Sequence, residues 1–182
     1  MRVIAGTAKG KVLKTPDGMF TRPTTDRVKE ALFSIIQFDI EGRKVLDLFA
    51  GCGQLGIEAI SRGADFVTFV DKSKQSIDVI NDNIKTVGFA QNSKIVNKDY
   101  AAFLSGCTDK FDIVFLDPPY SIGLLQEALS KLDKVIKDTS TVICEHPYGE
   151  NVPDFAGNLP KFRQYKYGKV AVTVYKRGEI DG

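Results

Sequence analysis

The sequence predicts an α/β fold with a doubly wound, mostly parallel sheet. Short apolar runs alternate with helical patterns through the middle of the chain, as in β-α-β-α units. A glycine-rich loop over Gly51–Gly56 joins the first apolar run to the helical pattern that follows. Near the end, Gly168-Lys169 separates two strand-like runs, which favours a hairpin and a last strand antiparallel to its neighbour. A chain of 182 residues fits one compact domain.

The apolar runs are typical of strands that are buried on both faces of a sheet. They cover Lys44–Phe49, Phe66–Val70, Ser93–Asn97, Phe111–Leu116 and Thr139–Glu145. Between them we expect helices over Gln54–Arg62 and Ile122–Leu132. A further helix is expected after the N-cap residue Ser73, because apolar side chains recur there at helical spacing, at Ile77, Ile80, Ile84 and Val87.

The two ends of the chain depart from this alternation. Residues 2–15 read as two extended strands that turn near Ala8-Lys9-Gly10, and the C-terminal hairpin is expected over Arg163–Tyr167 and Val170–Lys176. A helix is expected after Pro23, with one apolar face formed by Val28, Ala31, Leu32, Ile35 and Ile36. We therefore expect a basic N-terminal extension over residues 1–22 and one domain over residues 23–182.

Composition excludes some classes of protein. No apolar run approaches the ~20 residues that span a bilayer, and the N-terminus has no signal-peptide stretch, so a cytoplasmic protein is expected. Cys52, Cys107 and Cys144 are too scattered for a disulfide framework or a zinc site, and we expect no metal. A monomer is the simplest expectation.

Basic residues gather at the two ends. The net charge is +2 overall, but residues 1–30 carry seven Lys/Arg against three Asp/Glu, and residues 155–178 carry six Lys/Arg and no acid. Such ends can meet a polyanion, although solvated basic faces would look the same in the sequence.

The loop after the first strand has the pattern G-x-G-x-x-G, with Gly51, Gly53 and Gly56 between a strand and a helix. Glycines there permit a tight turn and let a ligand approach the backbone. Asp71 ends the next strand, where a carboxylate can accept hydrogen bonds from both hydroxyls of a ribose. These features also fit a nicotinamide-dependent oxidoreductase.

Asp47 favours a different cofactor. It lies at the mouth of the glycine loop, where it would repel the pyrophosphate of NAD but attract the ammonium and sulfonium of S-adenosylmethionine. Asp99 follows the third strand and could meet the adenine amine or simply cap a helix. The residues expected to bind the cofactor are Asp47, Phe49, Gly51, Gly53, Gly56, Asp71, Lys72, Asp99 and Tyr100.

The fourth strand runs straight into Asp117-Pro118-Pro119-Tyr120. Two prolines fix the backbone, so the Asp117 carboxylate and the Pro118 carbonyl have defined directions. Two fixed acceptors suit an NH2 group, and Tyr120 offers a face on which a base can stack. Hydrogen bonds to both amine protons localise the nitrogen lone pair, which can then attack a sulfonium methyl group. We therefore expect these four residues to be catalytic, with Asp117 stabilising the developing cation.

The sequence resembles the bacterial 16S rRNA guanine-N2 methyltransferases of the RsmD type. The resemblance covers nearly the whole chain and is carried by Thr21–Phe33, Leu46–Gly51, Leu55–Ala59 and Asp117–Tyr120. It implies a seven-stranded Rossmann-like methyltransferase sheet, S-adenosylmethionine as the donor, and a guanine amine in 16S rRNA or a small-subunit assembly particle as the acceptor. It also implies an N-terminal hairpin that helps to grip RNA. The basic residues of that end, Arg2, Lys9, Lys11, Lys14 and Arg22, are expected to make this contact. On a strand pair Lys9 and Lys11 would share a face, because side chains alternate with period two.

Two residues of the loop depart from that family. Cys52 stands where Ser is usual, and Gln54 where a small residue is usual. The C-terminal bases Lys161, Arg163, Lys166 and Lys169 form a rival basic patch, and spacing cannot decide which patch faces the active site.

Other functions remain open on sequence grounds. D-P-P-Y also serves methyl transfer to adenine or cytosine amines and to protein glutamine, and a non-catalytic RNA-binding module would require the motif to be vestigial. His146, the only histidine, is expected to be a loop residue without a chemical role, and no neighbour that would activate the Cys52 thiol is readable.

Overall fold

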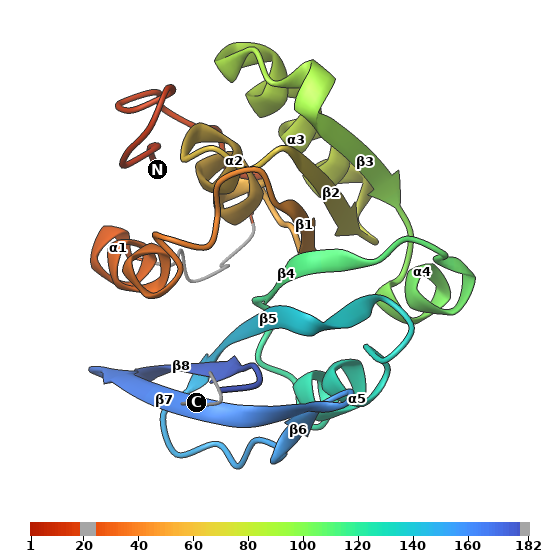
Figure 1. The fold of residues 1–182 in the computed structure, drawn as a ribbon. Helices are drawn as coiled ribbons and strands as arrows, with labels where there is room; N and C mark the ends of the chain where they lie inside the picture. Colours follow the sequence, from red (N-terminus) through yellow and green to blue (C-terminus); the bar gives the residue numbers. More distant parts are fainter. Residues whose placement is uncertain (19–24, 179–182) are drawn as a thin grey trace.

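The computed structural model describes residues 1–18 and 25–178, and their strands form one eight-stranded sheet in the order β3-β2-β1-β4-β5-β8-β7-β6 (Figure 1). The first five strands are parallel, and β8 pairs antiparallel with both β5 and β7. The strands are β1 (Lys44–Asp47), β2 (Phe66–Asp71), β3 (Ser93–Asn97), β4 (Phe111–Leu116), β5 (Ile136–Pro147), β6 (Phe155–Ala156), β7 (Leu159–Tyr167) and β8 (Val170–Tyr175).

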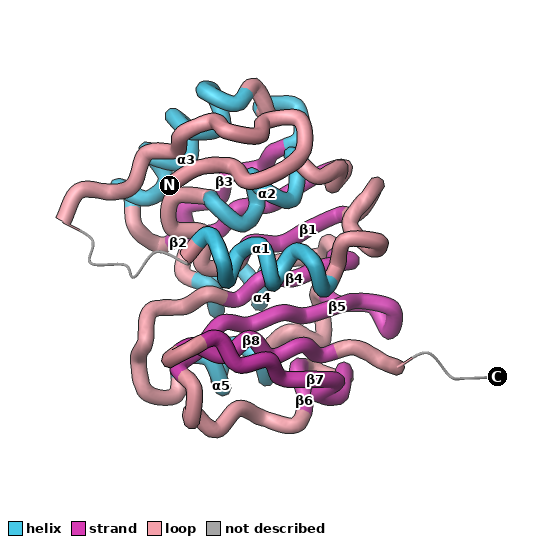
Figure 2. The backbone as a smooth tube through the Cα atoms, turned by 90° about the vertical axis from the view of Figure 1, so that its left-hand side faces the viewer, coloured by secondary structure: helices cyan, strands magenta, loops and turns pink. Residues whose placement is uncertain are grey.

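Helices cover both faces of this sheet (Figures 1 and 2). One apolar core lies under the first three helices and the other under the last two. The helices are α1 (Asp26–Ile35), α2 (Gln54–Ser61), α3 (Lys74–Val87), α4 (Tyr100–Gly106) and α5 (Leu124–Ser130), and a 3-10 turn, η1 (Ala90–Asn92), precedes β3. No helix in the described ranges is long and apolar enough to cross a membrane.

The doubly wound α/β fold is confirmed, including the antiparallel C-terminal hairpin. Ser73 caps α3 as expected, since its side chain accepts the backbone N–H of Ser76. The expected number of seven strands is wrong, because the two-residue strand β6 adds an eighth. So short a strand shows no periodicity in the sequence.

The N-terminal segment is not the regular two-stranded hairpin that we expected. Its antiparallel pairing is short and irregular: one bridge joins Arg2 and Val12, and backbone hydrogen bonds join Val3 to Lys11 and Leu13 to Met1. Gly6 and Gly10 have positive φ angles of 80° and 82°, and consecutive turns occupy residues 7–10. Lys9 therefore lies in a turn, and the expectation that it shares a strand face with Lys11 is wrong.

This segment is packed into the domain. Val3, Ala8 and Leu13 are buried and belong to the apolar cluster that also contains side chains of α1, α2 and α3. A Cβ atom at Gly6 would lie 1.7 Å from the Ser61 carbonyl oxygen, so only glycine permits this close approach. The segment crosses the outside of α2 and α3 (Figure 2).

A buried carboxylate holds the segment in place. Glu58 of α2 accepts the backbone N–H groups of Ile4 and Ala5 at 2.9 and 3.0 Å. The same fully buried side chain lies 3.4 Å from the buried ammonium of Lys29 in α1 and accepts from Arg62 Nε at 2.9 Å. Because one buried charge is satisfied by three chain segments, those segments must fold together.

Candidate active site

The predicted catalytic and cofactor-binding side chains meet at the carboxyl edge of the parallel strands. Asp47 ends β1 and is in register with Phe69 of β2 and Phe115 of β4. Asp71 ends β2, and Asp117 follows β4 by one residue. Strands β1 and β4 are paired, and neighbouring strands lie about 4.8 Å apart, so the glycine loop and D-P-P-Y begin close together. Ligands of open α/β sheets bind at this edge.

Each glycine of the loop meets a different steric demand. Gly51 and Gly53 have φ angles of 59° and 82°, and Gly53 is the N-cap of α2. Gly56 is inside α2, where an added Cβ would lie 2.3 Å from the Phe69 ring. No atom lies within 4 Å of a Cβ placed on Gly51, so the loop is open toward a ligand there.

Asp71 fastens the loop to the end of β2. Its two carboxylate oxygens accept the backbone N–H groups of Gly51 at 2.9 Å and Ser73 at 2.8 Å. Each oxygen of an ionised carboxylate can accept a further bond, so the predicted contact with ribose is compatible with this bracing. Lys72, next to it, is exposed.

Asp47 is almost completely buried, with 1% of its surface exposed. Its Oδ2 atom accepts the N–H of Gly56 at 3.1 Å. Burial raises the pKa of Asp47 from 3.8 to about 7, against the Gly56 hydrogen bond and with a smaller contribution from the charge of Asp71. A cation bound beside Asp47 would therefore favour the ionised carboxylate.

Gln54 is a candidate cofactor-binding residue that the sequence did not reveal. Its Oε1 atom is buried and has no hydrogen-bond partner among the described residues. A buried acceptor without a donor is costly, so an ammonium-bearing ligand would satisfy it. Together with buried Asp47 and the open side of Gly51, this acceptor fits the methionine end of S-adenosylmethionine.

Aromatic side chains follow β1 and β3. The rings of Phe49 and Tyr100 are 5.2 Å apart. Burial, with a hydrogen bond to Glu127, raises the pKa of Tyr100 to about 12, so its hydroxyl stays protonated. Asp99 caps α4 by accepting the N–H groups of Ala101 and Ala102 at 2.9 and 3.4 Å. A contact of Asp99 with adenine stays a prediction.

The D-P-P-Y motif follows β4 as expected. Asp117 is partly buried, Pro118 is buried and Pro119 is exposed. Tyr120 is 50% exposed, which leaves an aromatic face accessible at the carboxyl edge. Acceptor chemistry and a stacking surface therefore lie beside the glycine loop.

The predicted RNA-binding residues are spread over the N-terminal segment. Arg2 pairs with Asp26 at 3.2 Å and Lys14 with Asp82 at 2.9 Å, whereas Lys9 and Lys11 are exposed. Arg22 lies outside the described residues. RNA binding by these residues stays a prediction.

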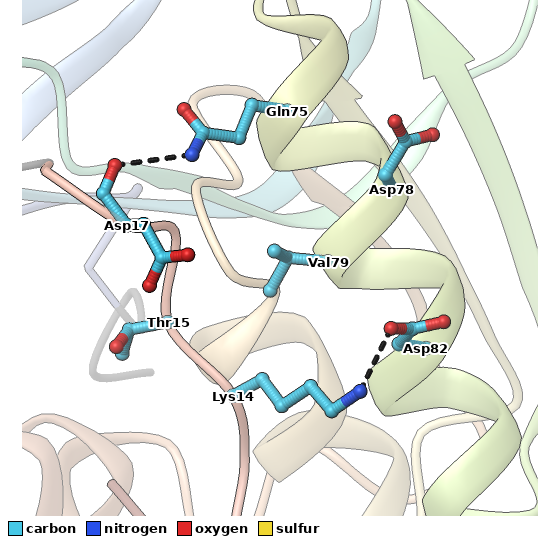
Figure 3. A pocket seen from close by; sticks show the side chains of 7 residues that line it. All are labelled: Lys14, Thr15, Asp17, Gln75, Asp78, Val79 and Asp82. Atoms are coloured by element: carbon cyan, nitrogen blue, oxygen red, sulfur yellow. Dashed lines mark hydrogen bonds and ion pairs between the residues drawn. The ribbon is translucent and has the colours of Figure 1, made fainter.

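A surface hollow of about 600 Å³ lies between this segment and α3. In Figure 3 the Lys14 ammonium reaches across the hollow to Asp82, and Asp17 and Asp78 also border it. With three carboxylates against one lysine, the hollow does not suit a phosphate backbone.

The two residues without an expected chemical role are buried. His146 lies in β5 and not in a loop, which corrects its expected position. Its ring nitrogens lie 2.9 Å from the Pro147 carbonyl oxygen and 2.8 Å from the Thr173 hydroxyl. Burial raises the pKa of the Cys52 thiol, which disfavours a thiolate nucleophile. Among the described residues, no group of His, Cys, Asp or Glu could hold a metal ion.

Known proteins are similar to this chain in sequence and in fold. A family model described as "Conserved hypothetical protein 95" matches residues 1–176. "Ribosomal RNA small subunit methyltransferase D" of Escherichia coli is 34% identical and aligns with 100% of this chain and 93% of its own. The protein of that name from Haemophilus influenzae is 38% identical over 72% of this chain and 70% of its own.

Solved structures agree with this assignment. The structure described as "Putative methyltransferase yhhF from Escherichia coli" matches with a TM-score of 0.88 and 32% identity, covering 97% of each chain. A Thermus protein at 24% identity shares the fold, with a TM-score of 0.83 over 97% of this chain and 99% of its own. Fold and site thus define a Rossmann-like methyltransferase. The chain belongs to the family of that model, and its relatives named ribosomal RNA small subunit methyltransferase D make this the RsmD family.

Proposed function

We propose that this protein transfers a methyl group from S-adenosylmethionine to the N2 amine of a guanine in 16S ribosomal RNA, during assembly of the small subunit. One observation carries the proposal: β1 and β4 are neighbouring strands, so the glycine loop that follows β1 and the D-P-P-Y motif that follows β4 start side by side. The names of the E. coli and H. influenzae relatives support the choice of RNA.

The cofactor would supply an electrophilic methyl group on its sulfonium. Asp47 and Gln54 would hold its ammonium end, and Asp71 would accept from its ribose. The glycine loop would let it approach the backbone, with Phe49, Lys72, Asp99 and Tyr100 nearby. These assignments rest on the position and chemistry of each side chain at the carboxyl edge.

The chain's own residues would position and activate the acceptor. Asp117 and the Pro118 carbonyl would accept the two protons of the amine, while Tyr120 stacks on the base. Fixing the amine and stabilising its developing positive charge are the main contributions that such a site can make. Asp117 would then hold the proton that the nitrogen loses.

The test is nucleoside mass spectrometry of rRNA from cells that lack the protein. One N2-methylguanosine of 16S rRNA should disappear, and wild-type protein should restore it while Asp117→Ala should not. Restoration on small-subunit particles or on naked rRNA would identify the substrate form. An unchanged rRNA together with a lost methyladenine, methylcytosine or methylglutamine would favour the other acceptors of D-P-P-Y enzymes.

A further inference from the structure

The tip of the C-terminal hairpin lies at the catalytic edge of the sheet. Strand β8 runs antiparallel to β5, so Val170 at its start is in register with Pro147 at the end of β5. The N–H of Tyr148 donates to the Lys169 carbonyl at 2.9 Å. Across the sheet, Val170 is therefore two strand spacings, about 10 Å, from β4, and Lys166 on β7 is three spacings away.

The N-terminal turn that carries Lys9 has the opposite position. Ala8 donates its N–H to Ser61 Oγ at the last residue of α2, whereas the glycine loop precedes the first. Eight helical residues, about 12 Å, separate those ends. Residues 14–17 run back along α3 toward its start, where Gln75 donates to the Asp17 carbonyl. Lys14 itself lies farther along α3, where it is already paired with Asp82.

The hairpin tip combines charge with an aromatic face. The Lys166 ammonium lies 4.0 Å from the centroid of the Tyr148 ring, and Tyr148 is 51% exposed. Lys166 and Lys169 are exposed, and neither forms an ion pair within the described part of the chain. Residues 155–178 contain no acid that would oppose them.

We propose that Tyr148, Lys166 and Lys169 form a second RNA contact, which holds single-stranded nucleotides flanking the target guanine. Tyr148 would stack on a flanking base, and the two lysines would contact its phosphates. A ring beside positive charges is the combination that binds single strands without reading their sequence. This inference rests on the proposed function, and it moves much of the RNA grip from the N-terminal turn to the C-terminal hairpin.

The experiment compares two matched pairs of substitutions, Lys166→Ala with Lys169→Ala and Lys9→Ala with Lys11→Ala. RNA binding is measured over a salt series with an oligonucleotide that spans the target guanine. Loss of two phosphate contacts should flatten the slope of log affinity against log salt by about 1.4 in the hairpin variant. The N-terminal variant should keep a slope close to wild type.

Tyr148 is tested separately. Tyr148→Ala should weaken RNA binding roughly 5- to 150-fold, whereas Tyr148→Phe should bind nearly as well as wild type because it keeps the ring. Cofactor affinity and melting temperature should be unchanged in all four variants, which separates RNA contact from a folding defect.

Three results would overturn the inference, and the first two distinguish its failure from that of the proposed function. If wild-type protein methylates rRNA but the hairpin variants bind RNA with wild-type affinity and slope, the hairpin makes no contact and the proposed function stands. If wild-type protein neither binds nor methylates rRNA, the proposed function fails and the hairpin contact fails with it. Binding of the hairpin to acidic peptide in preference to RNA would also overturn it.

Discussion

The two halves of the carboxyl edge are built differently. On the β1–β2 side the acidic side chains are already engaged by the backbone, since Asp47 accepts from Gly56, and Asp71 from Gly51 and Ser73. On the β4–β5 side, Tyr120 and Tyr148 are about half exposed. A small cofactor gains from a preformed cradle, whereas a large polyanion needs an accessible surface.

The largest effect is expected from a substitution on the β4–β5 side, where we propose that the acceptor base binds. Asp117→Ala should lower turnover by about 10²- to 10³-fold, because a preorganised group that stabilises developing charge is lost. Cofactor affinity, measured by calorimetry, should stay near wild type. Turnover within a factor of three of wild type at saturating cofactor would show that Asp117 does not act on the amine.

A smaller effect is expected from substitutions on the β1–β2 side, where we propose that the cofactor binds. Asp47→Ala should weaken S-adenosylmethionine binding by about 1.5–3 kcal/mol, the typical contribution of a hydrogen bond to a charged group. Asp71→Ala should weaken it as well, partly by releasing Gly51. RNA affinity is the control and should not change. Unaltered cofactor affinity in both variants would contradict the assignment.

Tyr120→Ala should raise the KM for RNA and slow turnover, by about 1–3 kcal/mol in kcat/KM if stacking positions the base. Tyr120→Phe keeps the ring and should retain most activity. Steady-state kinetics with both variants test this, and equal losses in Ala and Phe would point to the hydroxyl instead of the ring.

The smallest expected effect is a pH dependence of cofactor affinity, which arises from Asp47 on the β1–β2 side. With the pKa of Asp47 at about 7, the fraction ionised rises steeply between pH 6 and 8. If only the carboxylate attracts the ammonium, cofactor affinity should rise roughly tenfold over that range. Calorimetry at several pH values should show this rise in wild type and a flatter profile in Asp47→Asn.

The same titration affects folding with a defined sign. The folded-state pKa is raised, so between about pH 4 and 7 the folded protein holds a proton that the unfolded chain has lost. This contribution to stability is complete below pH 4 and is lost as the pH rises through 7. Denaturation of cofactor-free Asp47→Asn should lack this decline, and an identical pH profile in wild type would contradict the raised pKa.

Sequence reasoning succeeded where the signal is local. Strands β3 and β4 were placed to the residue because apolar runs and turns bound them, and the glycine loop follows its strand as the motif requires. It failed where contacts join distant residues. Glu58 meets Ile4, and Asn83 bonds to both Lys14 and Cys52, without any mark in the spacing.

The basic ends show the same limit. Counting charges predicted two candidate patches, but only the register of β5 with β8 relates the hairpin tip to the catalytic edge. Lys9 does not share a strand face with Lys11, because Gly6 and Gly10, with positive φ, replace the strand by turns. The unpartnered Oε1 atom of Gln54 depends on burial, which a single sequence does not give.

The carboxylate of Glu58 has a consequence for engineering. An N-terminal segment that carries exposed lysines looks like a part that could be exchanged between relatives. The segment is not an independent part of the structure, because Ile4, Lys29 and Arg62 all contact the buried carboxylate of Glu58. A chimera whose residues 1–14 follow a different backbone path would leave Glu58 without the Ile4 and Ala5 donors, so a transplant should carry the first two helices with it.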